Sequence, residues 1–300
     1  MTDPTTAPST PSGRSLEQLA SLATTGDRVA LEELLAAIQH QIYRHALRFL
    51  GHPADAEDAT QEILIRITTR LATFEHRSKF TTWAYTIATR MLIRTGQRRL
   101  ETVVGSPDDY AAFLDAGLSE HGRPSDEAER RELEDEVRIS CTYGMLLSLT
   151  RPSRAAYLLG DVLGFTDNEG AAICECSPAA FRQRLARART AMRRIIDDRC
   201  GLLDPANPCS CARQIAPLLD HGIINPDQLT FRDHPREPDQ RRIDPARFDP
   251  ARFERAATQL DHVVAIADLY RADRFAAPDE LWATISTAIP DLLDTIDSDH

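Results

Sequence analysis

Residues 53–100 read PADAEDATQEILIRITTRLATFEHRSKFTTWAYTIATRMLIRTGQRRL, and this stretch decides the fold prediction because three different chemistries follow one another along it. Its first half combines acids with apolar residues at helical spacing. Its middle gathers aromatic side chains, and residues 77–99 carry arginines and a lysine without an acid, although the chain has a formal net charge of -11. Cations bind phosphates and flat rings stack on unpaired bases, so the stretch predicts a nucleic-acid-binding surface. A solvated basic helix over an ordinary aromatic core is the alternative.

The whole chain has the composition of a folded protein of two or three domains, with 300 residues of which 42% are hydrophobic. Residues 1–13 are rich in Thr, Pro and Ser, which indicates a disordered tail rather than a secretory signal. No stretch approaches the roughly 18 apolar residues that a membrane helix needs. We therefore expect a cytoplasmic protein without a membrane partner. Its six cysteines should then be reduced, metal-bound or redox-sensing rather than paired in structural disulfides.

Apolar residues recur every three or four positions through most of the chain, which predicts an all-α fold. In the first domain, residues 14–100, we expect helices over 16–22, 27–50, 54–74 and 81–99. Residues 101–136 combine many acids with several glycines and prolines but lack a sustained apolar stripe. They therefore predict an acidic linker with some helix near its end, followed by a second helical domain over residues 137–199.

The second domain contains a helix-turn-helix pattern. Residues 166–169, Thr-Asp-Asn-Glu, form a capping box that opens a short helix ending at Ile173. A turn at Cys174-Glu175-Cys176 follows, and Ser177-Pro178 starts a second helix rich in Arg and Gln. In such motifs the second helix lies in the major groove of DNA. Helical hairpins also occur in proteins that never bind DNA, so the pattern alone leaves both interpretations open.

Both blocks resemble one family, the extracytoplasmic-function group of bacterial sigma factors within the sigma-70 family. DAEDATQEILIRI is similar to its core-polymerase-binding helix, and FTTWAYTIATRMLI to its promoter-melting helix. Residues 146–194 are similar to its second conserved domain. The resemblance covers about residues 14–199. It implies a region 2-like bundle, a region 4-like helix-turn-helix domain, and a non-enzymatic protein that binds core RNA polymerase and promoter DNA to start transcription.

The resemblance also assigns residues to three surfaces. The helix that docks on the clamp of the largest polymerase subunit would present Asp55, Glu57, Asp58, Gln61 and Glu62. The surface on the minus-ten side would comprise Lys79, Thr81, Trp83, Tyr85, Arg90, Arg94, Arg98 and Arg99. The surface on the minus-thirty-five side would comprise Ser177, Ala179, Arg182, Gln183, Arg184, Arg187 and Arg189. Trp83 fits either the core or the strand-binding surface.

Several positions depart from the family pattern. Glu175 stands where the family usually has a glycine, so it must accept a left-handed backbone or force another turn. Arg90 stands where a small polar residue is common. Gly170 replaces a larger residue and should loosen the first helix of the motif, whereas Cys174 and Cys176 fit buried small hydrophobes better than a metal pair.

Residues 200–300 form an extension that a minimal member of the group lacks. Cys200, Cys209, Cys211 and His221 could hold zinc, act as a redox sensor or be purely structural, and their spacing matches no familiar zinc motif. A proline-rich segment follows, and then two amphipathic helices are expected over 253–271 and 278–293. We expect the extension to dock on one of the two domains and regulate it, in place of or together with an anti-sigma protein.

Two other functions remain open at this stage. A helix-turn-helix regulator without polymerase binding would use the second block only. A zinc enzyme built on the four extension residues would lack an evident general base beside its ligands.

Overall fold

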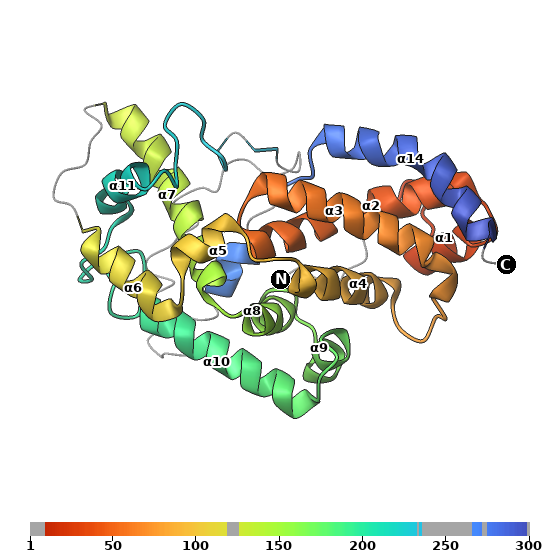
Figure 1. The fold of residues 1–300 in the computed structure, drawn as a ribbon, viewed down its shortest axis with the longest axis horizontal. Helices are drawn as coiled ribbons and strands as arrows, with labels where there is room; N and C mark the ends of the chain where they lie inside the picture. Colours follow the sequence, from red (N-terminus) through yellow and green to blue (C-terminus); the bar gives the residue numbers. More distant parts are fainter. Residues whose placement is uncertain (1–9, 119–125, 233, 236–265, 272–274, 299–300) are drawn as a thin grey trace. The chain divides into compact units, whose positions relative to one another are not determined.

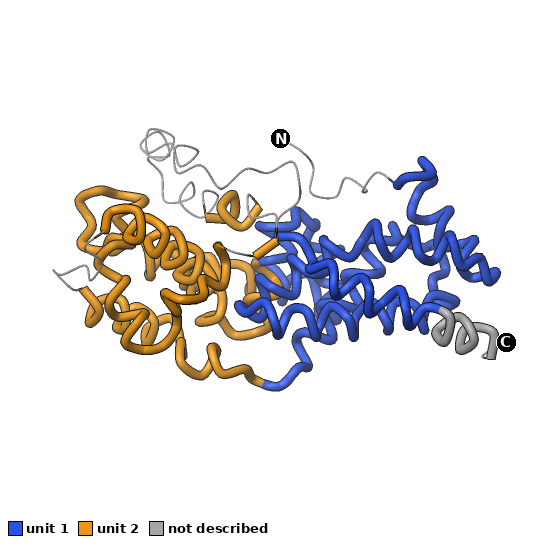
Figure 2. The backbone as a smooth tube through the Cα atoms, turned by 90° about the horizontal axis from the view of Figure 1, so that it is seen from above, with its two compact units in different colours: residues 1–96, 158–182, 275–300 blue, residues 97–157, 183–274 orange. Residues whose placement is uncertain are grey.

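The computed structural model describes residues 10–118, 126–232, 234–235, 266–271 and 275–298. Throughout these ranges the regular elements are helices, and strand-type pairing occurs as isolated bridges, among them Cys200–Cys209 and Asn225–Gln228. The all-α prediction is therefore confirmed. The chain divides into two compact units, residues 1–96, 158–182 and 275–300, and residues 97–157 and 183–274 (Figure 2). These units cut across the predicted domains.

The first unit begins with four helices whose ends follow local sequence signals. They are α1 (Leu16–Ala23), α2 (Arg28–Leu50), α3 (Pro53–Thr69) and α4 (Phe80–Arg94), with a short 3-10 helix, η1 (Leu71–Thr73), after α3. The Asp27 side chain accepts from the amide of Ala30 at the start of α2. Gly51 ends α2 in a left-handed conformation with φ 75°, and Pro53 occupies the first turn of α3.

The helix predicted over 81–99 is interrupted. α4 ends at Arg94, Thr95 is extended, and α5 (Arg99–Val104) begins after a short break. Gly96 lies in the break, and glycine costs about 1 kcal/mol in a helix interior, so the break coincides with the weakest helix former in the segment.

The rest of the first unit comes from distant parts of the chain. It comprises a π-helical turn, η2 (Leu158–Val162), α9 (Asp167–Ile173), the start of α10 (Pro178–Ile196) and α14 (Asp279–Ser298). α14 packs on α2 and α3, while α9 packs on α4 (Figure 1). The helix predicted over 278–293 is thus present as α14. Of the one predicted over 253–271, residues 266–271 are helical and residues 253–265 lie outside the described residues.

The second unit shows that the predicted linker is not a simple connector. Within the predicted linker, residues 101–118 belong mainly to α5 and α6 (Pro107–Ala116). The helix α7 (Glu127–Ser148) begins before the predicted linker ends at residue 136. Glu101 is 5% exposed and pairs with two arginines of α8 (Arg151–Tyr157), Arg151 at 2.6 Å and Arg154 at 2.8 Å. Arg154 also donates to the carbonyls of Leu146, Leu147 and Leu149. These contacts fasten α5 to the end of α7.

The first part of the extension also belongs to the second unit. α11 (Cys211–Asp220) packs on α7 through a core of buried aliphatic residues. That core comprises Leu133, Val137, Ile215, Leu218, Ile224 and Leu229. The amides of Phe231 and Arg232 donate to the buried carboxylate of Glu136. Residues 211–232 therefore share a core with α7 rather than forming a separate domain.

Candidate nucleic-acid interface

The acidic face of α3 is partly open. Asp58 and Glu62 are exposed, whereas Asp55, Glu57 and Gln61 are half-buried. Burial is the main cause that raises the pKa of Glu57, and the charges of Asp58 and Glu280 add to it. Since Glu280 belongs to α14, the start of α14 lies beside Glu57. One edge of the α3 face is therefore adjacent to the extension, and the edge with Asp58 and Glu62 faces solvent.

α14 is held against α2 and α3 by apolar packing. Leu281, Ile285 and Ile289 lie on one side of the helix and are 7%, 1% and 0% exposed. Just before the helix, the amide of Ala277 donates to Nδ1 of His40 in α2 at 3.0 Å. The sequence predicted that the extension docks on one of the two domains. In this structure α14 of the extension packs on α2 and α3 of the first.

The aromatic residues around the start of α4 pack mainly on one another. The ring of Trp83 lies 5.5 Å from that of Phe74 and 5.6 Å from that of Phe80, between centroids. Phe80 is fully buried, but Trp83 is only half-buried. Trp83 therefore combines a core contact with a solvent-facing edge. Lys79 is exposed and Thr81 is half-buried.

Tyr85 is placed differently from its predicted role. It is 6% exposed, and its ring meets His45 at 5.3 Å and Phe165 at 5.5 Å in edge-on contacts. Burial raises the pKa of Tyr85. Phe165 lies just before α9, so Tyr85 joins α4 to the later segment of the same unit and does not reach the surface in this structure.

Arg90 and Arg94, also predicted to bind DNA, contact the turn of the helix-turn-helix motif. One guanidinium nitrogen of Arg90 lies 3.0 Å from Oε1 of Glu175, and Arg94 lies 3.4 Å from Oε2. Arg90 also donates to two backbone carbonyls of α9. Of the remaining basic residues of this block, Arg99 is exposed and Arg98 is half-buried.

The helix-turn-helix pattern is present in α9 and α10. The capping box predicted at residues 166–169 forms, with the Thr166 amide donating to Glu169 at 2.9 Å. Glu175 does adopt the left-handed backbone, with φ 51°. Gly170 is closely packed, because a Cβ at this position would lie 2.2 Å from the ring of Phe181. The large side chain at 181 fills the space that glycine leaves.

The first turns of α10 present the predicted groove-reading side chains to solvent. Phe181, Leu185, Ala188 and Met192 are buried at helical spacing on the opposite side. Arg182 lies 3.6 Å from Asp167. The predicted residues divide into exposed ones, Ser177, Ala179, Arg182, Gln183 and Arg187, and half-buried ones, Arg184 and Arg189.

Four cysteines from two parts of the second unit line one apolar pocket. They are Cys141 in α7 and the extension residues Cys200, Cys209 and Cys211. Burial raises the pKa of Cys141 to about 12 and also raises that of the other three thiols. Since the thiolate is the nucleophile and the metal ligand, these groups are poorly reactive.

The fourth predicted metal ligand, His221, is engaged elsewhere. Its Nδ1 lies 2.8 Å from the carbonyl oxygen of Pro217, and its ring meets Phe113 edge-on at 5.1 Å. Among the described residues, no group of three or more His, Cys, Asp or Glu side chains could hold a metal ion. Zinc binding by the four predicted residues therefore gains no support from the described residues, and neither does the zinc-enzyme alternative.

Sequence reasoning missed three participants in these surfaces. Glu175 was noted only for its backbone, Phe165 was not considered, and His40 was counted merely as part of α2. Each of the three contacts a residue far away in the sequence, which local patterns do not predict. The unusual glutamate at position 175 was the one signal that pointed to such a contact. Within the part of the chain that the structure covers, no helix has the length and apolar character needed to span a membrane.

Comparisons with known proteins match this chain to sigma factors. The family model described as Sigma-70 region 2 matches residues 34–99. A probable RNA polymerase sigma-C factor of Mycobacterium bovis is 30% identical over 177 residues, which cover 58% of this chain and 87% of that protein. The RNA polymerase sigma-H factor of Pseudomonas aeruginosa is 28% identical over 180 residues, covering 59% and 91%. The ECF RNA polymerase sigma-E factor of Escherichia coli K12 is 29% identical over 171 residues, covering 56% and 86%.

Among solved structures, the sigma factor RpoE in complex with the anti-sigma factor NepR from Bartonella quintana covers 54% of this chain and 94% of its own. The sequence identity is 18% and the TM-score is 0.37.

Proposed function

This chain belongs to the extracytoplasmic-function group of the sigma-70 family, and on that basis we propose that it binds core RNA polymerase, recognises the minus-ten and minus-thirty-five elements of a promoter, and starts transcription there. The observation that carries the proposal is the 30% identity to a sigma-C factor over 87% of that protein's length. We assign no catalytic step to the chain and propose that it acts in the cytoplasm, where the polymerase works.

The polymerase-facing surface in this proposal is the open edge of α3. Asp58 and Glu62 are exposed there, and two carboxylates four residues apart point to the same side of a helix. Complementary charge between partners mainly raises the association rate and suppresses wrong partners. Charge reversal at these positions should therefore weaken binding to core polymerase.

The promoter-facing surfaces are α10 and α4. On α10, Arg182 and Gln183 lie exposed in the first turns, where recognition helices place the side chains that read base edges. A bidentate pair from arginine to guanine discriminates against a wrong base by about 1–3 kcal/mol. On α4, Lys79, Arg90 and Arg94 supply positive charge for the strand, beside the half-buried ring of Trp83.

The extension has a regulatory role in this proposal. α14 occupies the side of α3 next to Glu57 and covers apolar surface of α2 and α3. A polymerase surface that approaches the same helix has to share this space or displace α14. An intramolecular helix would thereby do part of the work of a separate anti-sigma protein, and such a protein remains a candidate partner for the full chain.

Binding to core polymerase tests the proposal directly. Purified full-length protein should co-elute with core RNA polymerase in gel filtration and support run-off transcripts, whereas a helix-turn-helix regulator without polymerase binding would do neither. The double variant Asp58→Arg, Glu62→Arg should lose co-elution. Glu129→Arg, at an exposed acid of α7, is the matched control and should retain it. Full-length protein that does not co-elute, or a double variant that co-elutes unchanged, would contradict the assignment.

A further inference from the structure

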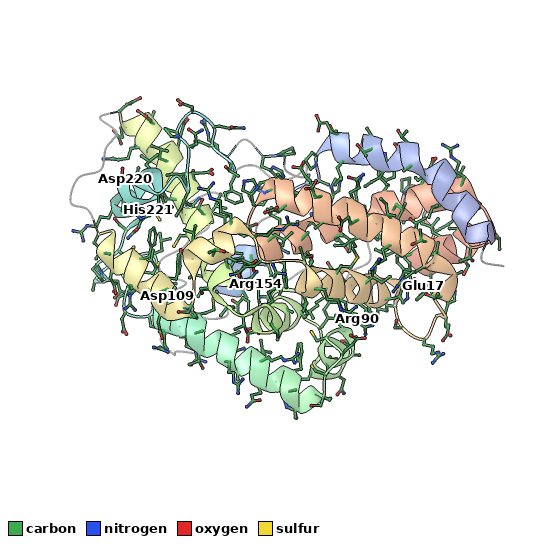
Figure 3. The ribbon with its side chains drawn as sticks, viewed as in Figure 1. Glu17, Arg90, Asp109, Arg154, Asp220 and His221 are labelled. Atoms are coloured by element: carbon green, nitrogen blue, oxygen red, sulfur yellow. The ribbon has the colours of Figure 1, made fainter. Side chains whose placement is uncertain are left out.

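Arg90 of α4 is fully engaged by α9 and the turn that follows it. Its Nε donates to the carbonyl oxygen of Ile173 at 3.1 Å, and one terminal nitrogen donates to that of Ala172 at 3.0 Å. The other terminal nitrogen lies 3.0 Å from the Glu175 carboxylate. A guanidinium has three nitrogens, and all three of Arg90 therefore have partners on this one segment. Figure 3 shows Arg90 on α4 beside α9.

The two carbonyls lie in the last turn of α9, where a helix leaves oxygens without an intrahelical amide and where its dipole favours a cation. Arg90 thus completes the end of a helix to which it does not belong. The contact is local to the first unit, since α4, α9 and the turn all belong to it.

Glu175 extends this contact to a second arginine. Its two carboxylate oxygens divide between Arg90 and Arg94, at 3.0 and 3.4 Å. Its backbone has φ 51°, a region that glycine adopts at no steric cost and that side chains rarely adopt. The chain therefore keeps a carboxylate at a position whose geometry favours having no side chain. The carboxylate of Glu175 contacts Arg90 and Arg94 of α4. Residues 77–99, which include α4, contain no acid of their own.

We propose that Glu175 is a gate on the α4 arginines: while it holds Arg90 and Arg94, these side chains cannot bind the phosphates of a nucleic-acid strand, and strand binding requires the contact to open. The inference rests on the proposed function, because it takes α4 to be the strand-binding helix. A phosphate and the Glu175 carboxylate need the same guanidinium donors. One must leave before the other binds.

The ion pairs of Glu175 with Arg90 and Arg94 are exposed to solvent, so the contact can open and close reversibly. The side chains of Glu175 and Arg94 are 52% and 74% exposed, and that of Arg90 is 34% exposed. Ion pairs this open to solvent shift an equilibrium only severalfold. A strand, which offers many phosphates together, can displace a single carboxylate, whereas a lone anion competes poorly.

The test compares two substitutions at one position with a charge-matched control. Glu175→Gln removes the charge and keeps the size, and Glu175→Gly suits the left-handed backbone and so secures a folded variant. Glu129→Gln is the control, because it removes one exposed carboxylate of α7, a helix outside the proposed DNA-binding surfaces. The probe is a fluorescein-labelled, mixed-sequence single-stranded DNA, because phosphate contacts carry no sequence preference. Its affinity is measured by anisotropy across a salt series with the full-length chain.

We expect both Glu175 variants to bind the strand about twofold to fivefold more tightly, the range that an exposed ion pair accounts for. The slope of log K against log salt should steepen by about 0.7 for each additional phosphate that the freed arginines neutralise. Glu129→Gln should increase the affinity less and leave the slope close to that of the unaltered chain. An equal increase in all three variants would show that only net charge matters and would overturn the gate.

A second readout follows the contact itself. Cys174 and Cys176 flank Glu175 and are half-buried, so their alkylation rates, measured by mass spectrometry, report opening of the turn. Glu175→Gln should raise these rates, but it should add nothing in an Arg90→Ala, Arg94→Ala background, where both ion pairs of Glu175 are already lost. Unchanged rates in Glu175→Gln would overturn the gate. If neither the unaltered chain nor Glu175→Gln binds the strand at low salt, the gate falls together with the α4 assignment, while co-elution with polymerase still decides the proposed function.

Discussion

The substitution Ile285→Ala should release α14 from α2 and α3. Ile285 is 1% exposed and lies between Leu281 and Ile289, which pack on the same side. Replacing a buried Ile by Ala costs about 2–5 kcal/mol. At about 1.4 kcal/mol for each factor of ten, the ratio of docked to undocked α14 should fall by about 30-fold to several thousand-fold.

Amide hydrogen exchange across residues 281–289 measures this release directly. Exchange there should rise by the same factor, while exchange in the middle of α4 should stay unchanged if the rest of the unit remains folded. Thr284→Ala is the matched control, because Thr284 is exposed on the same helix and surface substitutions usually change stability by less than about 0.5 kcal/mol. If α14 competes with polymerase for α3, Ile285→Ala should also bind core polymerase more tightly.

Two results would refute the reasoning separately. Equal exchange in Ile285→Ala and Thr284→Ala would mean that this apolar contact does not hold α14 in place. Faster exchange with unchanged polymerase affinity would support the packing of α14 but contradict its regulatory role.

Three further predictions concern the packing that supports these surfaces. Glu101→Gln leaves the buried Arg154 and the half-buried Arg151 without their counter-ion. It should lower the free energy of unfolding of the second unit by about 3–5 kcal/mol in urea titrations, with Glu129→Gln as the exposed control. A loss below about 1 kcal/mol would contradict the burial of this ion pair. Burial lowers the pKa of His45 to about 3, so between pH 6.5 and 3 this histidine is protonated in the unfolded chain but neutral in the folded chain. The free energy of unfolding of the first unit should therefore fall by up to about 1.4 kcal/mol per pH unit over this range. His45→Gln should flatten that pH dependence. Gly170→Ala brings a Cβ to 2.2 Å from the Phe181 ring and should lower the melting temperature, whereas Gly170→Ala with Phe181→Leu should recover part of the loss.

Local signals in the sequence predicted the helices well. Asp27, Gly51 and Pro53 set the ends of α2 and α3 because their effects act within one turn of the chain. The side chains exposed on α10 had been assigned by the family resemblance, and Phe181, Leu185 and Ala188 are buried on the opposite side of the helix. Where neighbouring residues decide the structure, a single sequence was enough.

Contacts between distant residues were beyond such signals. Glu101 looked like one more solvated acid in a linker, but its partners Arg151 and Arg154 lie 50 and 53 residues further along the chain. The family resemblance assigned Tyr85 to the strand-binding surface, and nothing near it in sequence indicated that Phe165 would cover it. In both cases the burial of a side chain depended on which later segment folded back onto it.

The position of α14 in the chain has a consequence for newly made protein. A ribosome reaches Asp279 roughly 210 residues after it has passed the end of α3, which takes about 10–40 s at ~5–20 residues per second. During that interval α2 and α3 can fold, but the helix that covers them has not yet been translated. Each molecule therefore passes through a period in which this surface is open to any partner present near the ribosome, and the covering helix arrives only afterwards.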